Sequence, residues 1–173
     1  MKKIIAVIAG FISVVLAHAS LNENATLTPS TPAGQVLIFI SASMPQDSVV
    51  QWVEQANTTH AEVIIQGLVG DTLLDTKHWM QQVVNQTTNK QGGVQINPLL
   101  FKQYAITAVP AVVVVPPSAV CLPTMSCGVL RADRVWGNVS LATALQKIVS
   151  RSDAASATAQ RALLRLGALH AQP

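Results

Sequence analysis

Short apolar runs and amphipathic stretches alternate along most of the chain, and turn-forming residues separate them. Apolar runs bounded by Gly, Pro or Asn are typical of buried strands, and they occur at about residues 36–41, 62–69, 94–96, 111–115 and 128–136. Apolar residues spaced three and four apart predict helices at about residues 44–56, 71–89, 98–104 and 140–149. Alternating strands and helices, closed by a strand pair and a helix, predict an α/β fold.

Two helix starts carry residues that suit the positive end of a helix. Ser43 can accept a hydrogen bond as the cap of the first helix, with Pro45 in its first turn, where a missing N–H costs nothing. Ser43 as a nucleophile is the weaker interpretation, because no His or Lys lies nearby in the sequence to act as a base. Asp71 and Asp75 are spaced as paired acids could be, but helix N-termini also favour negative charge, and we expect the second role.

The first nineteen residues have the pattern of a secretory signal. Lys2 and Lys3 precede an apolar run at 4–16, which is followed by the small-residue cleavage pattern Ala17-His18-Ala19. The run is shorter than the roughly 20 residues that span a membrane. We therefore expect cleavage near Ala19/Ser20 and export to the periplasm of a Gram-negative bacterium, with an uncleaved anchor as the alternative. No later stretch of the sequence predicts a transmembrane segment.

Removal of the signal almost cancels the charge of the chain. The full sequence has 11 basic and 8 acidic residues, and loss of Lys2 and Lys3 leaves nine against eight. The remaining basic residues form no stripe or patch, so the sequence lacks the electrostatic footprint of a nucleic-acid-binding protein. Half of all residues are apolar and only 11% are charged, which indicates surface that becomes buried against a protein partner.

The order of the elements resembles thioredoxin. Where a thioredoxin carries its two redox cysteines, this chain has Ser41-Ala42-Ser43-Met44-Pro45, after the first strand. Ile106-Thr107-Ala108-Val109-Pro110 precedes the strand at 111–115, as the cis-proline segment of thioredoxin-like folds does. The resemblance implies a central mixed sheet with helices on both faces, and a cis-Pro110 that faces the start of the first helix.

A narrower resemblance rests on four stretches in the same order. They are ISASMPQDSVVQWVEQA, VIIQGLVGDTLLDT, VQINPLLFKQYAITAVPAVVV and VWGNVSLATALQKI. Together they resemble the F-type conjugative pilin-assembly family TrbC, over roughly residues 36–149; Asn97 stands where an Asp is commoner. The resemblance implies a periplasmic, thioredoxin-like protein that is needed to assemble the pilus of a type IV secretion channel. It also implies other conjugative transfer envelope proteins as partners, a TraW-like assembly protein first among them.

Cys121 and Cys127 are the two cysteines of the chain, with five residues between them. In an oxidising compartment we expect them to pair. The bridge stabilises the fold by only about 2 kcal/mol, because closing a short loop removes little chain entropy from the unfolded state. A redox-active pair is the alternative, but the spacing is not that of a redox motif and neither cysteine begins a predicted helix. No His flanks them at the spacing of a metal site, so we expect neither a metal nor another cofactor.

The sequence predicts a signal peptide at 1–19, a lead at 20–35, the thioredoxin-like domain at 36–151 and an Ala/Leu-rich, helical tail at 152–173. The predicted partner-binding groove lies between two segments, Ser43, Met44 and Pro45 on one side and Val109 and Pro110 on the other. Trp136, beside the predicted edge strand, is a further docking candidate.

We therefore expect a non-enzymatic assembly factor that docks other envelope components. The alternative is a periplasmic thiol-disulfide oxidoreductase or isomerase that uses Cys121 and Cys127, and a third hypothesis is an envelope protein unrelated to conjugation.

Overall fold

The computed structural model describes residues 34–88, 93–117 and 132–170, with side chains through residue 167. The predicted signal, nearly all of the lead, the cysteine pair and the start of the last predicted strand lie outside the described residues. Within the described part of the chain, none of the helices is long and apolar enough to cross a membrane.

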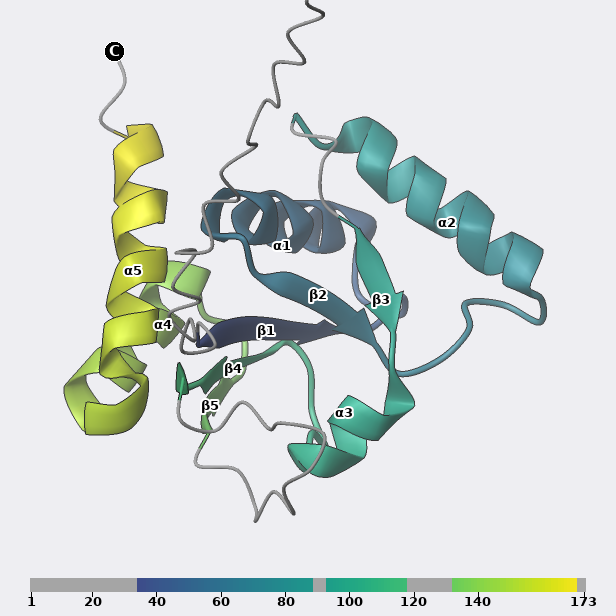
Figure 1. Ribbon diagram of the computed structural model, residues 1–173. Coiled ribbons are helices and arrows are strands. Elements are labelled where there is room, and N and C mark those ends of the chain that lie inside the picture. Colours follow the sequence, from purple (N-terminus) through teal and green to yellow (C-terminus); the bar gives the residue numbers. More distant parts are fainter. Residues whose placement is uncertain (1–33, 89–92, 118–131, 171–173) are drawn as a thin grey trace, which may run out of the picture.

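The described residues form a five-stranded mixed sheet in the order β3-β2-β1-β4-β5 (Figure 1). The strands are β1 (Gln35–Ile40), β2 (Glu62–Ile65), β3 (Val94–Ile96), β4 (Ala111–Val115) and β5 (Asp133–Trp136). β1, β2 and β3 run parallel to one another, and β4 runs antiparallel to both β1 and β5. β1 and β4 are buried along nearly their whole length because they occupy the centre of the sheet, which explains why they read as continuous apolar runs.

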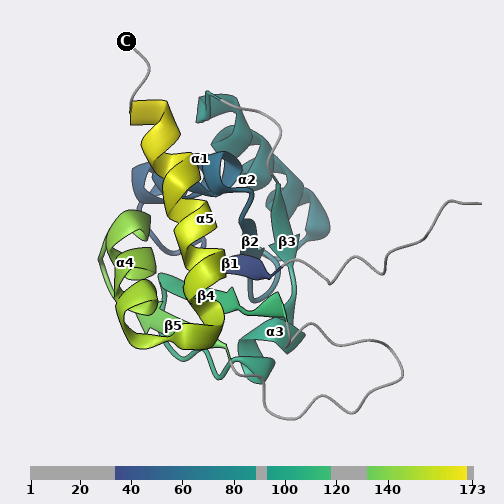
Figure 2. The same ribbon diagram turned by 60° about the vertical axis from the view of Figure 1, so that its left-hand side comes forward.

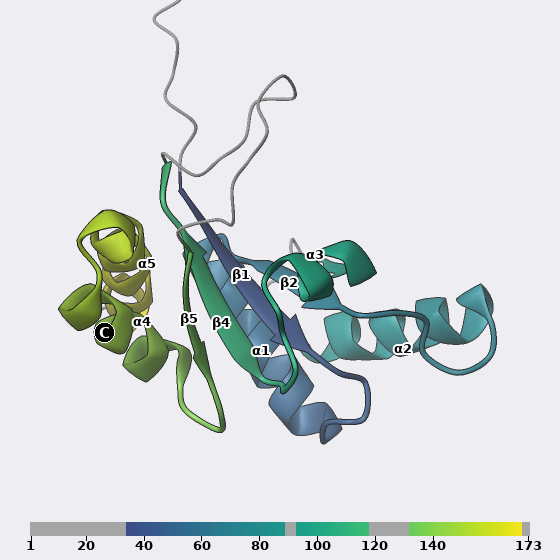
Figure 3. The same ribbon diagram turned by 90° about the horizontal axis from the view of Figure 1, so that it is seen from below.

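Five helices complete the described fold. They are α1 (Gln46–Thr59), α2 (Leu73–Gln86), α3 (Pro98–Gln103), α4 (Leu141–Arg151) and α5 (Asp153–His170). α1, α4 and α5 lie on one side of the sheet, and α3 lies on the other (Figures 2 and 3). The predicted α/β fold with helices on both faces of a mixed sheet is confirmed, and the Val109–Pro110 peptide bond is cis, as expected.

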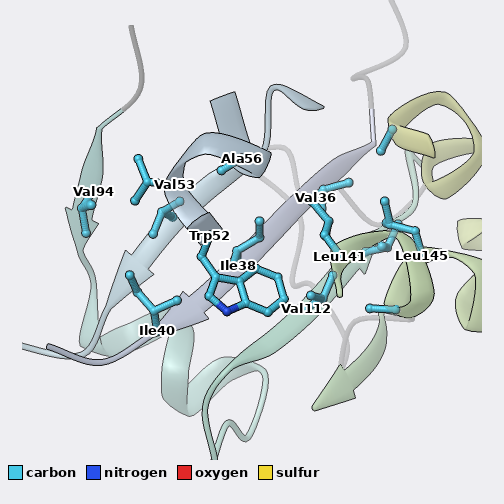
Figure 4. Packing of buried hydrophobic residues seen from close by; sticks show 14 of the residues in the cluster. Val36, Ile38, Ile40, Trp52, Val53, Ala56, Val94, Val112, Leu141 and Leu145 are labelled. Atoms are coloured by element: carbon cyan, nitrogen blue, oxygen red, sulfur yellow. The ribbon is translucent and has the colours of Figure 1, made fainter. Parts of the chain in front are cut away.

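The larger hydrophobic core lies between the sheet and the helices α1, α4 and α5. Trp52, Val53 and Ala56 of α1 pack on the sheet together with Leu141 and Leu145 of α4 (Figure 4). α5 adds three buried alanines, whose small side chains let its backbone approach closely; they are Ala155, Ala159 and Ala162. Residues 153–170 of the tail predicted to follow the domain are therefore a helix of the same core.

A smaller core lies on the opposite face of the sheet, under α3. Phe101 meets Phe39 edge to face, with ring centroids 4.9 Å apart and planes at 89°, and Tyr104 stands at the other side of Phe39 at 6.1 Å. Arg134 of β5 donates a hydrogen bond to the carbonyl oxygen of Tyr104 at the end of α3. These contacts fix one short helix over the middle of the sheet.

Several helix boundaries differ from the predicted ones. The second helix begins at Leu73, not at 71, because Thr72 caps it: Thr72 and Asp75 form a reciprocal capping box. Asp75 thus serves the helix N-terminus as expected, whereas Asp71 precedes the cap. α3 is capped by Asn97, whose Oδ1 accepts from the Leu100 amide at 3.2 Å, so the amide at this position does the capping that an Asp would do.

Candidate docking groove at one end of the sheet

A cavity of about 450 Å³ opens at the end of the sheet where β1 and β2 finish and β4 begins. Three loop segments and one side chain of α3 line it: residues 40–43, 65–69 and 106–109, and Phe101. Phe101 is buried and forms its apolar floor together with Ile106, which is partly buried against the same smaller core. We call this cavity the docking groove.

The first wall follows β1 and is held by its own two serines. The Ser41 and Ser43 hydroxyls are 2.8 Å apart, and the Ser43 amide donates to the Ser41 hydroxyl at 3.2 Å. The Met44 amide donates to the Ser41 carbonyl at 3.1 Å, which closes a tight turn before α1. The prediction that Ser43 caps α1 is wrong: Pro45 occupies the cap position, and no side chain makes a capping hydrogen bond there. The Ser43 hydroxyl instead forms a hydrogen bond with the Ser41 hydroxyl inside the turn.

The second wall is the segment 66–69, which the sequence predicts as the end of a strand. β2 instead ends at Ile65, and Gly67 and Gly70, the latter with φ of +70°, let the chain turn away from the sheet. The buried Thr76 side chain of α2 holds this wall, since its hydroxyl accepts from the Val69 amide at 2.9 Å and lies 3.2 Å from the Val69 carbonyl. Leu68 is left 52% exposed.

The third wall, residues 106–109, connects α3 to β4. Ala105 adopts a left-handed conformation with φ of +48°, and the Ile106 amide donates to the Phe101 carbonyl at 2.8 Å, so the chain leaves α3 at a fixed angle. The carbonyl of Pro110 accepts from the Gly137 amide at 3.0 Å, which ties the other end of this wall to β5. Arg134 supports the same wall because it holds the end of α3.

The groove offers main-chain groups at Val109. The β1–β4 ladder has its last pair at Phe39 and Ala111, and Pro110 has no N–H with which to continue it. If the ladder continued in the same register, Ser41 would lie opposite Val109. The structure records no hydrogen bond for the Val109 backbone among the described residues. Val109 therefore brings main-chain groups to the lining of the groove for which no ladder partner is recorded among the described residues.

All fourteen lining residues are uncharged, and none is a cysteine or a histidine. Ser41 and Ser43 consequently have no base beside them in the groove, which leaves their hydroxyls without the activation that nucleophilic catalysis needs. Across the described residues there is also no cluster of three or more His, Cys, Asp or Glu that could hold a metal ion. The groove can therefore bind a partner through its shape, through hydrogen bonds and through apolar contacts.

The family model for the type-F conjugative transfer system pilin assembly protein matches residues 38–148. The chain belongs to this family. The match begins in β1 and ends in α4, so all three walls of the docking groove lie inside it, whereas α5 lies beyond it.

Two further comparisons give similar proteins. The periplasmic protein TrbC of Escherichia coli (strain K12) is 29% identical over 122 residues, which cover 70% of this chain. The chain spans about half, 51%, of the length of that curated relative. The solved structure of MTB dsbF in its mixed oxidized and reduced forms is 17% identical, with a TM-score of 0.42, and the alignment covers 79% of this chain and 81% of that one.

The groove of this pilin assembly family member includes two of the five predicted partner-binding residues. Ser43 and Val109 line it. The other three flank it: Met44 packs partly buried against the larger core, Pro45 is exposed at the start of α1, and Pro110 is half-buried at the start of β4. The sequence pattern did not predict that the segment 66–69 and Phe101 line the groove. Gly67 and Gly70 could have indicated a turn there, but the apolar residues beside them favoured a strand.

Trp136 is 61% exposed at the end of the edge strand β5. It pairs with Ala111, the first residue of β4, and therefore lies at the same end of the sheet as the docking groove. Because side chains of paired residues share a face, Trp136 is on the face that α3 covers. An exposed large aromatic side chain near a groove is typical of docking surfaces.

Proposed function

We propose that this chain is a periplasmic, non-enzymatic assembly factor of a conjugative pilus, and that it acts by docking other envelope components of the transfer system. The docking groove is the single observation that carries the docking part: it has an apolar floor and free main-chain groups, and its lining contains no titratable side chain. Membership of the pilin assembly family supports the role in conjugation. The predicted signal and the name of the periplasmic relative support the compartment.

In this proposal a partner segment pairs with Val109 as an added strand and places side chains on the floor below. Strand addition uses main-chain hydrogen bonds for affinity and leaves side-chain pockets to supply specificity. Val109, Ser43 and the neighbouring walls form the contact, and Trp136 extends it along the same end of the sheet. A TraW-like assembly protein is the partner that the family resemblance favours.

The test fills the groove with a bulky side chain. Ala108 is an exposed lining residue, and Ala108→Trp puts an indole where the partner segment would lie. Gln160→Trp, on the exposed side of α5, is the matched control. In a strain that lacks the wild-type gene, we expect the control to restore surface pili and DNA transfer and Ala108→Trp to fail, at equal protein levels. Full activity of the Ala108→Trp protein would contradict docking at this groove.

A further inference from the structure

The residues that line the docking groove also indicate the chemistry of the segment that binds there. All fourteen of its residues are uncharged, in a protein whose described surface elsewhere carries both signs of charge. Residues 34–88 carry five acidic side chains and one lysine, while 141–170 carry four basic side chains and one aspartate. The charges are thus distributed over the rest of the domain and kept out of this groove.

The floor makes a charged occupant costly. Phe101 is 5% exposed, Ile106 is partly buried beside the same core, and both side chains provide only carbon surface. A charged side chain lowered onto them would lose its water and gain no counter-charge, because no lining residue carries one. An apolar side chain would lose nothing of that kind and would gain from burial.

The polar side chains that line the groove, which we call its rim, favour neutral groups that form hydrogen bonds. Four polar side chains on the three walls can both donate and accept hydrogen bonds without carrying charge: Ser41, Ser43, Gln66 and Thr107. The N–H and C=O of Val109, for which no hydrogen bond is recorded within the described residues, add a main-chain donor and a main-chain acceptor. Such a rim matches backbone amides and small polar side chains.

We infer that the occupant of the docking groove is an uncharged, extended segment of a partner protein that rests one apolar side chain on the floor formed by Phe101 and Ile106. This inference rests on the proposed docking function and adds the chemistry of the segment. Acidic or basic segments are excluded by the missing counter-charge, and the affinity of the contact depends little on salt because no ion pair contributes to it.

A charge scan of the rim tests the inference with either sign. Gln66 and Thr107 are exposed lining residues on two different walls, so their substitution leaves the core intact. The charged variants are Gln66→Glu, Gln66→Lys, Thr107→Glu and Thr107→Lys, and the matched controls are Gln146→Glu and Gln146→Lys on the exposed side of α4, outside the groove. The readout is transfer frequency in a strain that lacks the wild-type gene, at matched protein level and with thermal unfolding measured for each purified variant.

An uncharged occupant requires both signs to be harmful. We expect transfer to fall by about tenfold or more for Glu and Lys alike at Gln66 and Thr107, and to stay within about twofold for the Gln146 controls. If one sign impairs transfer while the other preserves or raises it, the segment is charged, which overturns the inference and leaves docking intact. If neither sign has an effect at either position, the groove is not the docking site, and the proposed function fails with it.

Discussion

Phe101 connects the stability of the fold to the shape of the docking groove, and a single substitution there tests both. Its ring is 5% exposed, packs edge to face on Phe39, and forms part of the groove floor. Phe101→Leu keeps an apolar side chain of good helix propensity but removes the ring. The same helix offers a matched control, because Leu99 is 70% exposed two residues earlier.

The cost of Phe101→Leu follows from what the ring contacts. Edge-to-face aromatic pairs contribute about 0.5–1.5 kcal/mol beyond the area they bury. The smaller side chain also buries less apolar surface and leaves a small cavity, which costs about 1 kcal/mol more. We therefore expect the free energy of unfolding to fall by about 2 kcal/mol. For Leu99→Ala we expect a change within about 0.5 kcal/mol, since exposed positions without special contacts are tolerant.

Urea denaturation followed by tryptophan fluorescence measures both variants, and transfer assays at matched protein level measure the groove. We expect Phe101→Leu to weaken transfer, because the floor under the partner's side chain has changed, while Leu99→Ala transfers as the wild type does. Equal stability losses for the two variants would refute the position of α3 over the sheet. A destabilised Phe101→Leu protein with undiminished transfer would refute the role of this ring in docking.

Three further predictions concern other parts of the chain. A Cβ on Gly34 would lie 2.1 Å from a hydroxyl of α5 and 2.6 Å from a carbonyl oxygen of β4, so Gly34→Ala should cost about 1–3 kcal/mol in chemical denaturation; an unchanged midpoint would contradict the docking of α5. Hydrogen bonds from Thr72 hold the pKa of Asp75 below its ordinary value, so its contribution to stability is present at neutral pH and is lost as the pH falls through the depressed pKa. The Asp75→Asn protein should accordingly lose less stability than the wild type between neutral pH and strongly acidic pH, and an identical pH profile would argue against the capping box. A Cys121→Ser/Cys127→Ser double variant should restore pili and transfer at matched protein level; a stable, abundant but inactive variant would instead favour thiol chemistry.

The fold was predictable from the sequence where burial alone decides the structure. β1 and β4 are apolar along nearly their whole length because they lie at the centre of the sheet, and no local preference competes with that pattern. The start of the helix predicted at about 140–149 was also close to the observed one: Ser140 caps α4, and its hydroxyl accepts from the Thr143 amide at 3.1 Å.

The groove was only partly predictable, because its walls depend on contacts between distant segments. Nothing local reveals that Thr76, on the second helix, holds Val69 away from the sheet, so the apolar residues of 66–69 were interpreted as strand. The Ser43 cap failed for a related reason: Ser41, two residues earlier, competes for the same hydroxyl. The packing of α5 against the sheet likewise depends on contacts between its small residues and distant parts of the chain. An Ala-rich sequence alone does not predict those contacts.

The most direct measurement of the central claim is site-specific photo-crosslinking in cells that assemble pili. A photoreactive residue is placed at Thr107 in the docking groove and, as the control, at Gln146 on the exposed side of α4. If the groove is the docking site, Thr107 captures a segment of another envelope protein of the same transfer system, identified by mass spectrometry, and Gln146 does not capture it. Capture of that protein from Gln146 alone, or no capture from the groove in piliated cells, would contradict docking at this site.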